Sequence, residues 1–80
     1  MNVQVLLFAS YADAFRAPHV DVALPEGATV RDLLARVKTM AAGHALPPAP
    51  VVALNQVYAG LDETIRAGDE VAIIPPVAGG

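Results

Sequence analysis

The residues with the clearest chemical use stand at the end of the sequence, which closes with Pro-Pro-Val-Ala-Gly-Gly at positions 75–80. No residue after Glu70 carries a charged side chain. Six extended residues reach about 20 Å, and consecutive prolines favour a stiff, extended backbone. We therefore expect a tail at 75–80 that projects from a folded domain at 1–74. Glycine at the last two positions would let a narrow channel close around the backbone, because no side chain stands in the way.

The group that such a tail presents is the carboxylate of Gly80. A carboxylate is a poor electrophile until it is activated, and a mixed anhydride with a phosphate of ATP provides a good leaving group. A sulfur nucleophile can then displace that leaving group, which produces a thiocarboxylate. The simpler interpretation is an inert terminus, because small residues are common at chain ends. The tail by itself leaves both interpretations open.

The remaining polar residues do not form a catalytic or metal-binding pattern. The two histidines, His19 and His44, are far apart in the sequence, with no cysteine or carboxylate cluster beside them. The acidic pairs at 62–63 and 69–70 are typical of turns and helix starts. Because cysteine is absent, disulfides, thiolate ligands and a thiol nucleophile are excluded. We therefore expect no metal site, no bound cofactor and no catalytic activity from the chain alone.

The composition predicts one small globular domain. The chain has 80 residues, of which 55% are hydrophobic and 16% charged, and this is enough for one modest core. The net charge of −3 argues against a nucleic-acid partner. Prolines and glycines interrupt the long uncharged stretch at 39–61, and the first residues lack the basic residues of a signal peptide. We expect a cytoplasmic protein without a membrane partner, whose surplus apolar surface contacts another protein.

The hydrophobic periodicity predicts a two-layer α+β domain. Alternation indicates strands at 2–8, 19–24, 51–54, 57–59 and 70–74. Thr29 is the expected N-cap of the main helix, which we expect to stop at Gly43. Short helical turns are expected at 11–16, started by Ser10, and at 61–66, started by Asp62. One amphipathic helix cannot bury its apolar stripe alone, so the strands must form a single sheet against it.

The same patterns separate a core from an outer apolar set. The expected core positions are those on the helix stripe and on the inner face of the strands at 2–8, 19–24 and 70–74: Val3, Val5, Leu7, Val20, Val22, Leu24, Val30, Leu33, Leu34, Val37, Met40, Ala41, Val71 and Ile73. The opposite sheet face also carries five apolar or aromatic residues: Leu6, Phe8, Tyr58, Ala72 and Ile74. We call them the outer apolar set. They form either a docking patch or an ordinary sheet surface covered by the 11–16 turn.

Stretches from the whole chain carry a resemblance to a known family: VLLFAS at 5–10, LPEGATV at 24–30, ALNQ at 53–56, GDEVA at 68–72 and IPPVAGG at 74–80. In these stretches the sequence resembles the ubiquitin-like sulfur-carrier family, and within it the small subunits of molybdopterin synthase. The closing block is the most specific part. The resemblance implies a ubiquitin-like β-grasp fold, a mixed sheet of about five strands packed on one main helix, with the first and last strands parallel at its centre.

The resemblance also implies a reaction cycle and partners. An E1-like adenylyltransferase (MoeB-like) would activate Gly80 with ATP, and a sulfur donor would convert it to a thiocarboxylate. The tail, from Pro75, Pro76, Val77 and Ala78 to Gly79, would then enter a large synthase subunit (MoaE-like) in a heterotetramer. There the sulfur would pass to cyclic pyranopterin monophosphate in molybdenum cofactor biosynthesis. Phe8, Tyr58 and Ile74 match the positions at which the family docks its partners.

Two kinds of alternative remain. The first is a carrier of the same family with another destination for its sulfur or its terminus: thiamine synthesis, tRNA thiolation or protein modification. The second is a β-grasp adaptor that binds a partner without catalysis and whose tail is inert. A variant lengthened or shortened at Gly80 separates the second alternative from the carrier, because an adaptor would keep its role.

Overall fold

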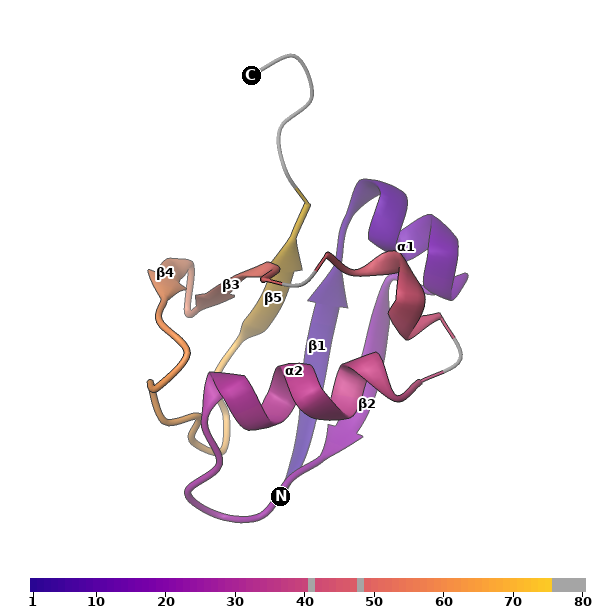
Figure 1. Ribbon diagram of the computed structural model, residues 1–80. Coiled ribbons are helices and arrows are strands. Elements are labelled where there is room, and N and C mark those ends of the chain that lie inside the picture. The colour runs from indigo at the N-terminus through magenta and orange to yellow at the C-terminus, as the bar shows by residue number, and fades with distance from the viewer. Residues whose placement is uncertain (41, 48, 76–80) are drawn as a thin grey trace.

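The computed structural model describes residues 1–40, 42–47 and 49–75, which form one mixed sheet with a helix across one face (Figure 1). The strand order is β2-β1-β5-β3-β4. β1 and β5 are parallel at the centre of the sheet, and the other neighbouring strands are antiparallel. The predicted β-grasp fold is therefore confirmed. The elements are β1 (Asn2–Leu7), α1 (Ala9–Phe15), β2 (His19–Ala23), α2 (Val30–Lys38), the 3-10 helix η1 (Gly43–Ala45), β3 (Val51–Leu54), β4 (Val57–Ala59) and β5 (Val71–Ile74).

The main helix, α2, begins as predicted and ends early. The Thr29 hydroxyl accepts a hydrogen bond from the Asp32 N–H, and the Asp32 carboxylate accepts one from the Thr29 N–H, 2.9 Å away, which completes a capping box. The helix ends at Lys38, so the prediction that it stops at Gly43 was wrong. Gly43 begins η1, and a Cβ atom there would collide with the Lys38 backbone. The glycine therefore permits a close approach of two backbone segments.

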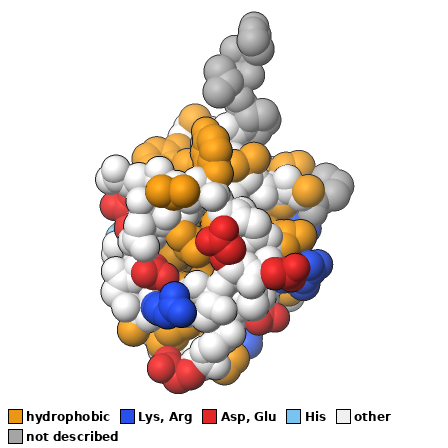
Figure 2. Space-filling model, turned by 90° about the vertical axis from the view of Figure 1, so that its left-hand side faces the viewer, with side chains coloured by type: hydrophobic (Ala, Val, Ile, Leu, Met, Phe, Trp, Pro, Cys, Tyr) orange, Lys and Arg blue, Asp and Glu red, His pale blue; other side chains and the backbone are white. Residues whose placement is uncertain are grey.

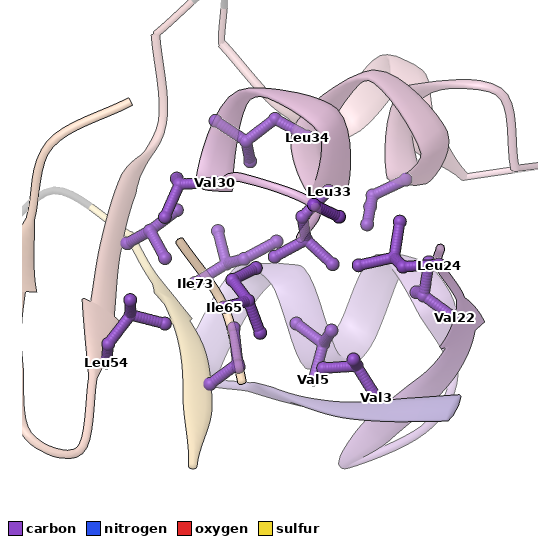
Figure 3. Close-up of a cluster of buried hydrophobic side chains, with 14 of the residues drawn as sticks. Val3, Val5, Val22, Leu24, Val30, Leu33, Leu34, Leu54, Ile65 and Ile73 are labelled. Atoms are coloured by element: carbon purple, nitrogen blue, oxygen red, sulfur yellow. The ribbon is translucent and has the colours of Figure 1, made fainter. Parts of the chain in front are cut away.

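Side chains from the sheet and from α2 form the core (Figure 3). Most of the expected core positions are buried, whereas Val20 and Met40 are only partly so; Ala41 lies outside the described residues. Ile65, which the sequence analysis did not place in the core, is almost fully buried. Within the described residues, no helix is long and apolar enough to cross a membrane.

The segment that carries Ile65 is not helical, so the expected turn at 61–66 was wrong. The Ile65 N–H donates to the Ala28 carbonyl at 2.8 Å, and Thr64 forms a bridge with Thr29. Asp62 does not cap a helix; its carboxylate pairs with Arg31 at 3.0 Å. Long-range pairing with the entry to α2 therefore replaces the local helical structure.

The first helix lies at the end of β1, and its start also differs from the prediction. α1 begins at Ala9, and its N-cap is Phe8, which provides no side-chain hydrogen bond, so the expected cap at Ser10 was wrong. Ala9 has a φ of 47°, so the chain turns sharply where β1 ends. This turn buries Tyr11 in the core and leaves Phe8 46% exposed.

Candidate functional site

The strand register aligns small and apolar residues across the sheet face opposite α2. Leu6 of β1 lies opposite Ala72 of β5, and Ala72 lies opposite Ala53 of β3. Ala53 in turn lies opposite Tyr58 of β4. These pairs form one continuous row across four neighbouring strands. Because side chains alternate between the two faces of a strand, Phe8 and Ile74 lie on this same face, nearer the end where β5 stops.

A groove of about 400 Å³ follows this row. Its lining residues come from the strands and their turns: Leu6, Phe8, Ala53, Gln56, Tyr58, Glu70, Ala72 and Ile74. The structure thus brings together the five residues of the outer apolar set. None of the lining residues belongs to α1, and Phe8 and Tyr58 are exposed, which favours the docking patch over a surface covered by the 11–16 segment. Seen from the side of β3 and β4, hydrophobic side chains gather toward the end where β5 stops, and charged ones lie mainly farther away (Figure 2).

The two aromatic residues of the groove remain strongly exposed. Tyr58 is 76% and Phe8 46% accessible to solvent. Burying one large apolar side chain contributes on the order of 1.5–3 kcal/mol, so a partner that covered both rings would gain appreciable binding energy. Their predicted role in partner binding, shared with Ile74, remains a prediction.

The polar end of the groove is held by a set of hydrogen bonds that we call the Asn55 clamp, formed by Asn55, Asp69 and Glu70. The Asn55 side chain donates to the Asp69 carboxylate at 3.1 Å and accepts from the Glu70 N–H at 3.0 Å. The Asn55 N–H donates to the Glu70 carbonyl at 2.8 Å. The clamp therefore fastens the β3–β4 turn to the start of β5.

The strands expected at 51–54 and 57–59 leave a turn at 55–56 between them, but the sequence analysis missed the clamp. Asn55 and Gln56 both have positive φ values, 52° and 69°, a conformation typical of tight hairpin turns and one that asparagine tolerates well. The available signal was an Asn-Gln pair between two apolar runs, together with an acidic pair just before the last strand. This signal does not show that the turn at 55–56 and the acidic pair at 69–70 meet in the fold.

Asp69 acts as a hydrogen-bond acceptor in this turn. Its carboxylate accepts from the Arg66 N–H at 2.8 Å as well as from Asn55. These two hydrogen bonds, the one from Arg66 foremost, hold the pKa of Asp69 below its usual value. A carboxylate stabilised in its ionised form is suited to fixing a turn and poorly suited to proton transfer at neutral pH.

The other sequence-predicted residues take the following positions. His19 lies on β2 opposite Leu6, whereas His44 lies in η1. In the described part of the chain, no group of three His, Cys, Asp or Glu residues could hold a metal ion. Pro75 directly follows β5, at the same end as the apolar part of the groove. The predicted site residues Pro76, Val77, Ala78, Gly79 and Gly80 lie outside the described residues.

Comparison with known proteins agrees with this geometry. A family model described as the ThiS family matches residues 5–80. A curated relative from Chlamydomonas reinhardtii, a molybdopterin synthase sulfur carrier subunit, is 40% identical over 100% of both chains. The crystal structure of SAMP1 from Haloferax volcanii is similar with a TM-score of 0.83 and 31% identity, over 100% of both chains. A putative molybdopterin converting factor, subunit 1, from Pyrococcus furiosus has a TM-score of 0.78 and 31% identity, over 96% of this chain and 99% of that one. The chain belongs to the ThiS family, the ubiquitin-like sulfur-carrier family that its sequence resembles.

Proposed function

We propose that this protein is the sulfur-carrier subunit of a molybdopterin synthase, a MoaD-like protein, and that the carboxylate of Gly80 carries the sulfur. The observation that carries the proposal is the position of the groove. Ile74 is the last residue of β5 and lines the groove, and Pro75 follows it at once. A partner seated on the groove would therefore stand beside the start of the tail, whose six residues reach about 20 Å when extended.

The proposed chemistry takes place on the tail and requires no side chain of this chain as acid, base or nucleophile. A Gly80 carboxylate oxygen attacks the α-phosphate of ATP, which forms an acyl-adenylate and releases pyrophosphate. The outer sulfur of a donor persulfide then attacks the carbonyl carbon and displaces AMP, which leaves an acyl disulfide. A second thiol attacks the donor's sulfur, forms a disulfide with it and releases the thiocarboxylate. Transfer of that sulfur to cyclic pyranopterin monophosphate, with hydrolysis at the carbonyl carbon, returns the carboxylate. ATP is thus consumed by the activating enzyme.

Two proteins are required as partners in this cycle. The first is a large synthase subunit of the MoaE type, which would cover the groove and take the tail into its active site. The similarity to proteins named as subunits supports such an assembly. We propose a heterotetramer with one carrier at each end of a large-subunit dimer. The second partner is an E1-like adenylyltransferase of the MoeB type, which would use the same face at a different step.

Reconstitution tests the proposal directly. Thiocarboxylated protein, a MoaE-type subunit and cyclic pyranopterin monophosphate should together yield molybdopterin. A variant that lacks Gly80, and another with one alanine added after it, should fold and still bind the large subunit but should transfer no sulfur. Full activity of either variant would contradict the proposal. Intact-mass analysis of protein from its own cell should show a fraction heavier by one oxygen-to-sulfur exchange on a chain that ends at Gly80.

A second candidate function is protein modification, and one similarity favours it. SAMP1 of Haloferax volcanii is also described as small archaeal modifier protein 1. An activated Gly80 would then react with a lysine amine of a target protein and form an isopeptide bond. Mass spectrometry of trypsin-digested cell extracts tests this function by searching for peptides in which a lysine carries residues 67–80, because Arg66 is the last basic residue of the chain. If no such peptides form while molybdopterin synthesis proceeds, protein modification is excluded.

A further inference from the structure

The groove contains one charged side chain, Glu70. The other lining residues are apolar, except for the uncharged Gln56. Glu70 is exposed, and it forms no ion pair within the described residues, where the recorded pair joins Arg31 and Asp62. Since the side chains of positions 70, 72 and 74 alternate onto one sheet face, the carboxylate marks one end of the groove and Ile74 marks the other.

The backbone of Glu70 is held in a fixed position. Its N–H donates to the Asn55 side chain at 3.0 Å, and its carbonyl accepts from the Asn55 N–H at 2.8 Å. The charge is therefore attached to an ordered point of the sheet, although the side chain itself is accessible. The backbone position from which the carboxylate projects therefore needs no ordering when a partner engages it, and only the side-chain rotamers remain to be fixed.

A partner that covers the groove must also compensate this charge. Covering the groove removes water from the Glu70 carboxylate, and an ionised group that loses its water without gaining an opposite charge is strongly unfavourable. An apolar partner surface alone would incur this cost. A second copy of this chain docked groove to groove would bring two such carboxylates into one interface, which also disfavours self-association through this face.

We propose that the large synthase subunit places a lysine or arginine side chain against Glu70 while an apolar segment covers Phe8, Tyr58 and Ile74. This inference rests on the proposed function and specifies the partner chemistry that the groove selects. Ile74 lies four positions after Glu70, so the cation would contact the groove about 13 Å from the point where the tail leaves the sheet. The ion pair would select the partner and orient it, so that its active site faces the tail.

Charge variants of the carrier test the inference against a purified MoaE-type subunit. Glu70→Gln should raise the dissociation constant roughly tenfold, and Glu70→Lys should raise it more, because a like charge is then desolvated. Glu26→Gln is the matched control: it makes the same charge change at an exposed turn outside the groove. That control should bind within about twofold of the wild type. Salt should weaken wild-type binding more steeply than binding of the Glu70→Gln variant.

A compensating charge on the large subunit gives a rescue test for the ion pair. A charge-reversed large subunit, with glutamate in place of the contacting lysine or arginine, should restore binding of Glu70→Lys, and circular dichroism should show that each variant is folded. If Glu70→Gln binds like Glu26→Gln, the inference is overturned, while the proposed function stands as long as the wild type still binds and delivers sulfur. If the wild type neither binds nor delivers sulfur, the proposed function fails, and the inference fails with it.

Discussion

Ala53 of β3 lies directly opposite Ala72 of β5, and both alanines line the groove on the open face of the sheet. Larger side chains flank this pair, because Leu6 lies opposite Ala72 on the far side and Tyr58 lies opposite Ala53. The hollow thus exists because the two central positions carry only methyl groups. The shape of the groove therefore follows from the sizes of the side chains in this one row, to which each of four neighbouring strands contributes one residue.

The first prediction is that filling this hollow blocks docking and leaves the fold intact. Ala53→Leu should weaken binding of a MoaE-type subunit about tenfold or more, while the free energy of unfolding falls by about 1–3 kcal/mol at most, because Ala53 is buried but lines the groove into which the added atoms extend. Ala35→Leu, on the exposed side of α2, should leave the affinity unchanged. Calorimetric titration and urea denaturation measure the two quantities. Unchanged binding of Ala53→Leu would show that the partner docks elsewhere.

The second prediction separates the hydrogen bonds of the Asn55 clamp from the backbone conformation at that residue. Asn55→Gly keeps the positive φ of 52° accessible and removes two side-chain hydrogen bonds. It should lower the free energy of unfolding by about 1–2 kcal/mol. Asn55→Ala loses the same hydrogen bonds and adds left-handed strain, so it should be less stable by about another 1 kcal/mol. Equal stability of the two variants in urea denaturation would contradict the role of the left-handed backbone.

The third prediction concerns acid stability. Because the pKa of Asp69 is lowered in the folded state by hydrogen bonds from Arg66 and Asn55, its stabilising contribution is fully present above its unfolded value of about 3.9. The contribution is lost as the pH falls through the lower folded value. Asp69→Asn should therefore be less stable than the wild type near neutral pH, and the difference should shrink below about pH 4. Urea denaturation across this pH range measures the difference.

The control for this pH series is Asp13→Asn. The Asp13 carboxylate makes no recorded hydrogen bond within the described residues, and its side chain is exposed on α1. The difference in unfolding free energy between Asp13→Asn and the wild type should not follow the pattern of Asp69→Asn. If both variants gave the same dependence on pH, the acid sensitivity would come from the net charge and not from the turn at Asp69.

The fourth prediction concerns the end of β5. Val51 pairs with Ile74, so the next pair in this antiparallel register would join Pro50 to Pro75, and neither proline has an N–H to donate. A double Pro50→Val and Pro75→Val variant should let the β3–β5 ladder grow, which should protect the new amides from hydrogen exchange and slow adenylation of Gly80. Pro47→Val, at an exposed loop proline, should leave adenylation unchanged. Unaltered adenylation in the double variant would show that these prolines do not keep the carrier end accessible.

The local sequence pattern was sufficient to predict a residue's role where that residue interacts with its near neighbours in the chain or with the core as a whole. Period-two alternation identified most of the buried residues of β1, β2 and β5, and helical spacing identified the buried stripe of α2. The capping role of Thr29 is also local, since its partner Asp32 is three residues away. The apolar set around Phe8 and Tyr58 could be predicted as a group because alternation assigns each member to the outer face.

Pairing between distant segments could not be predicted in this way. The 61–66 segment has local features of a helical turn, yet Ile65 bonds to Ala28. The Asn55 clamp joins residues on separate turns. Hydrophobic periodicity does not predict which turns lie close together in the fold. The sequence by itself determined the fold class and most of the core, whereas the chemistry of its Gly-Gly end remains a prediction. Only the tertiary structure decided that the apolar set forms a groove with one carboxylate at its far end, because strand order and register are properties of the assembled sheet.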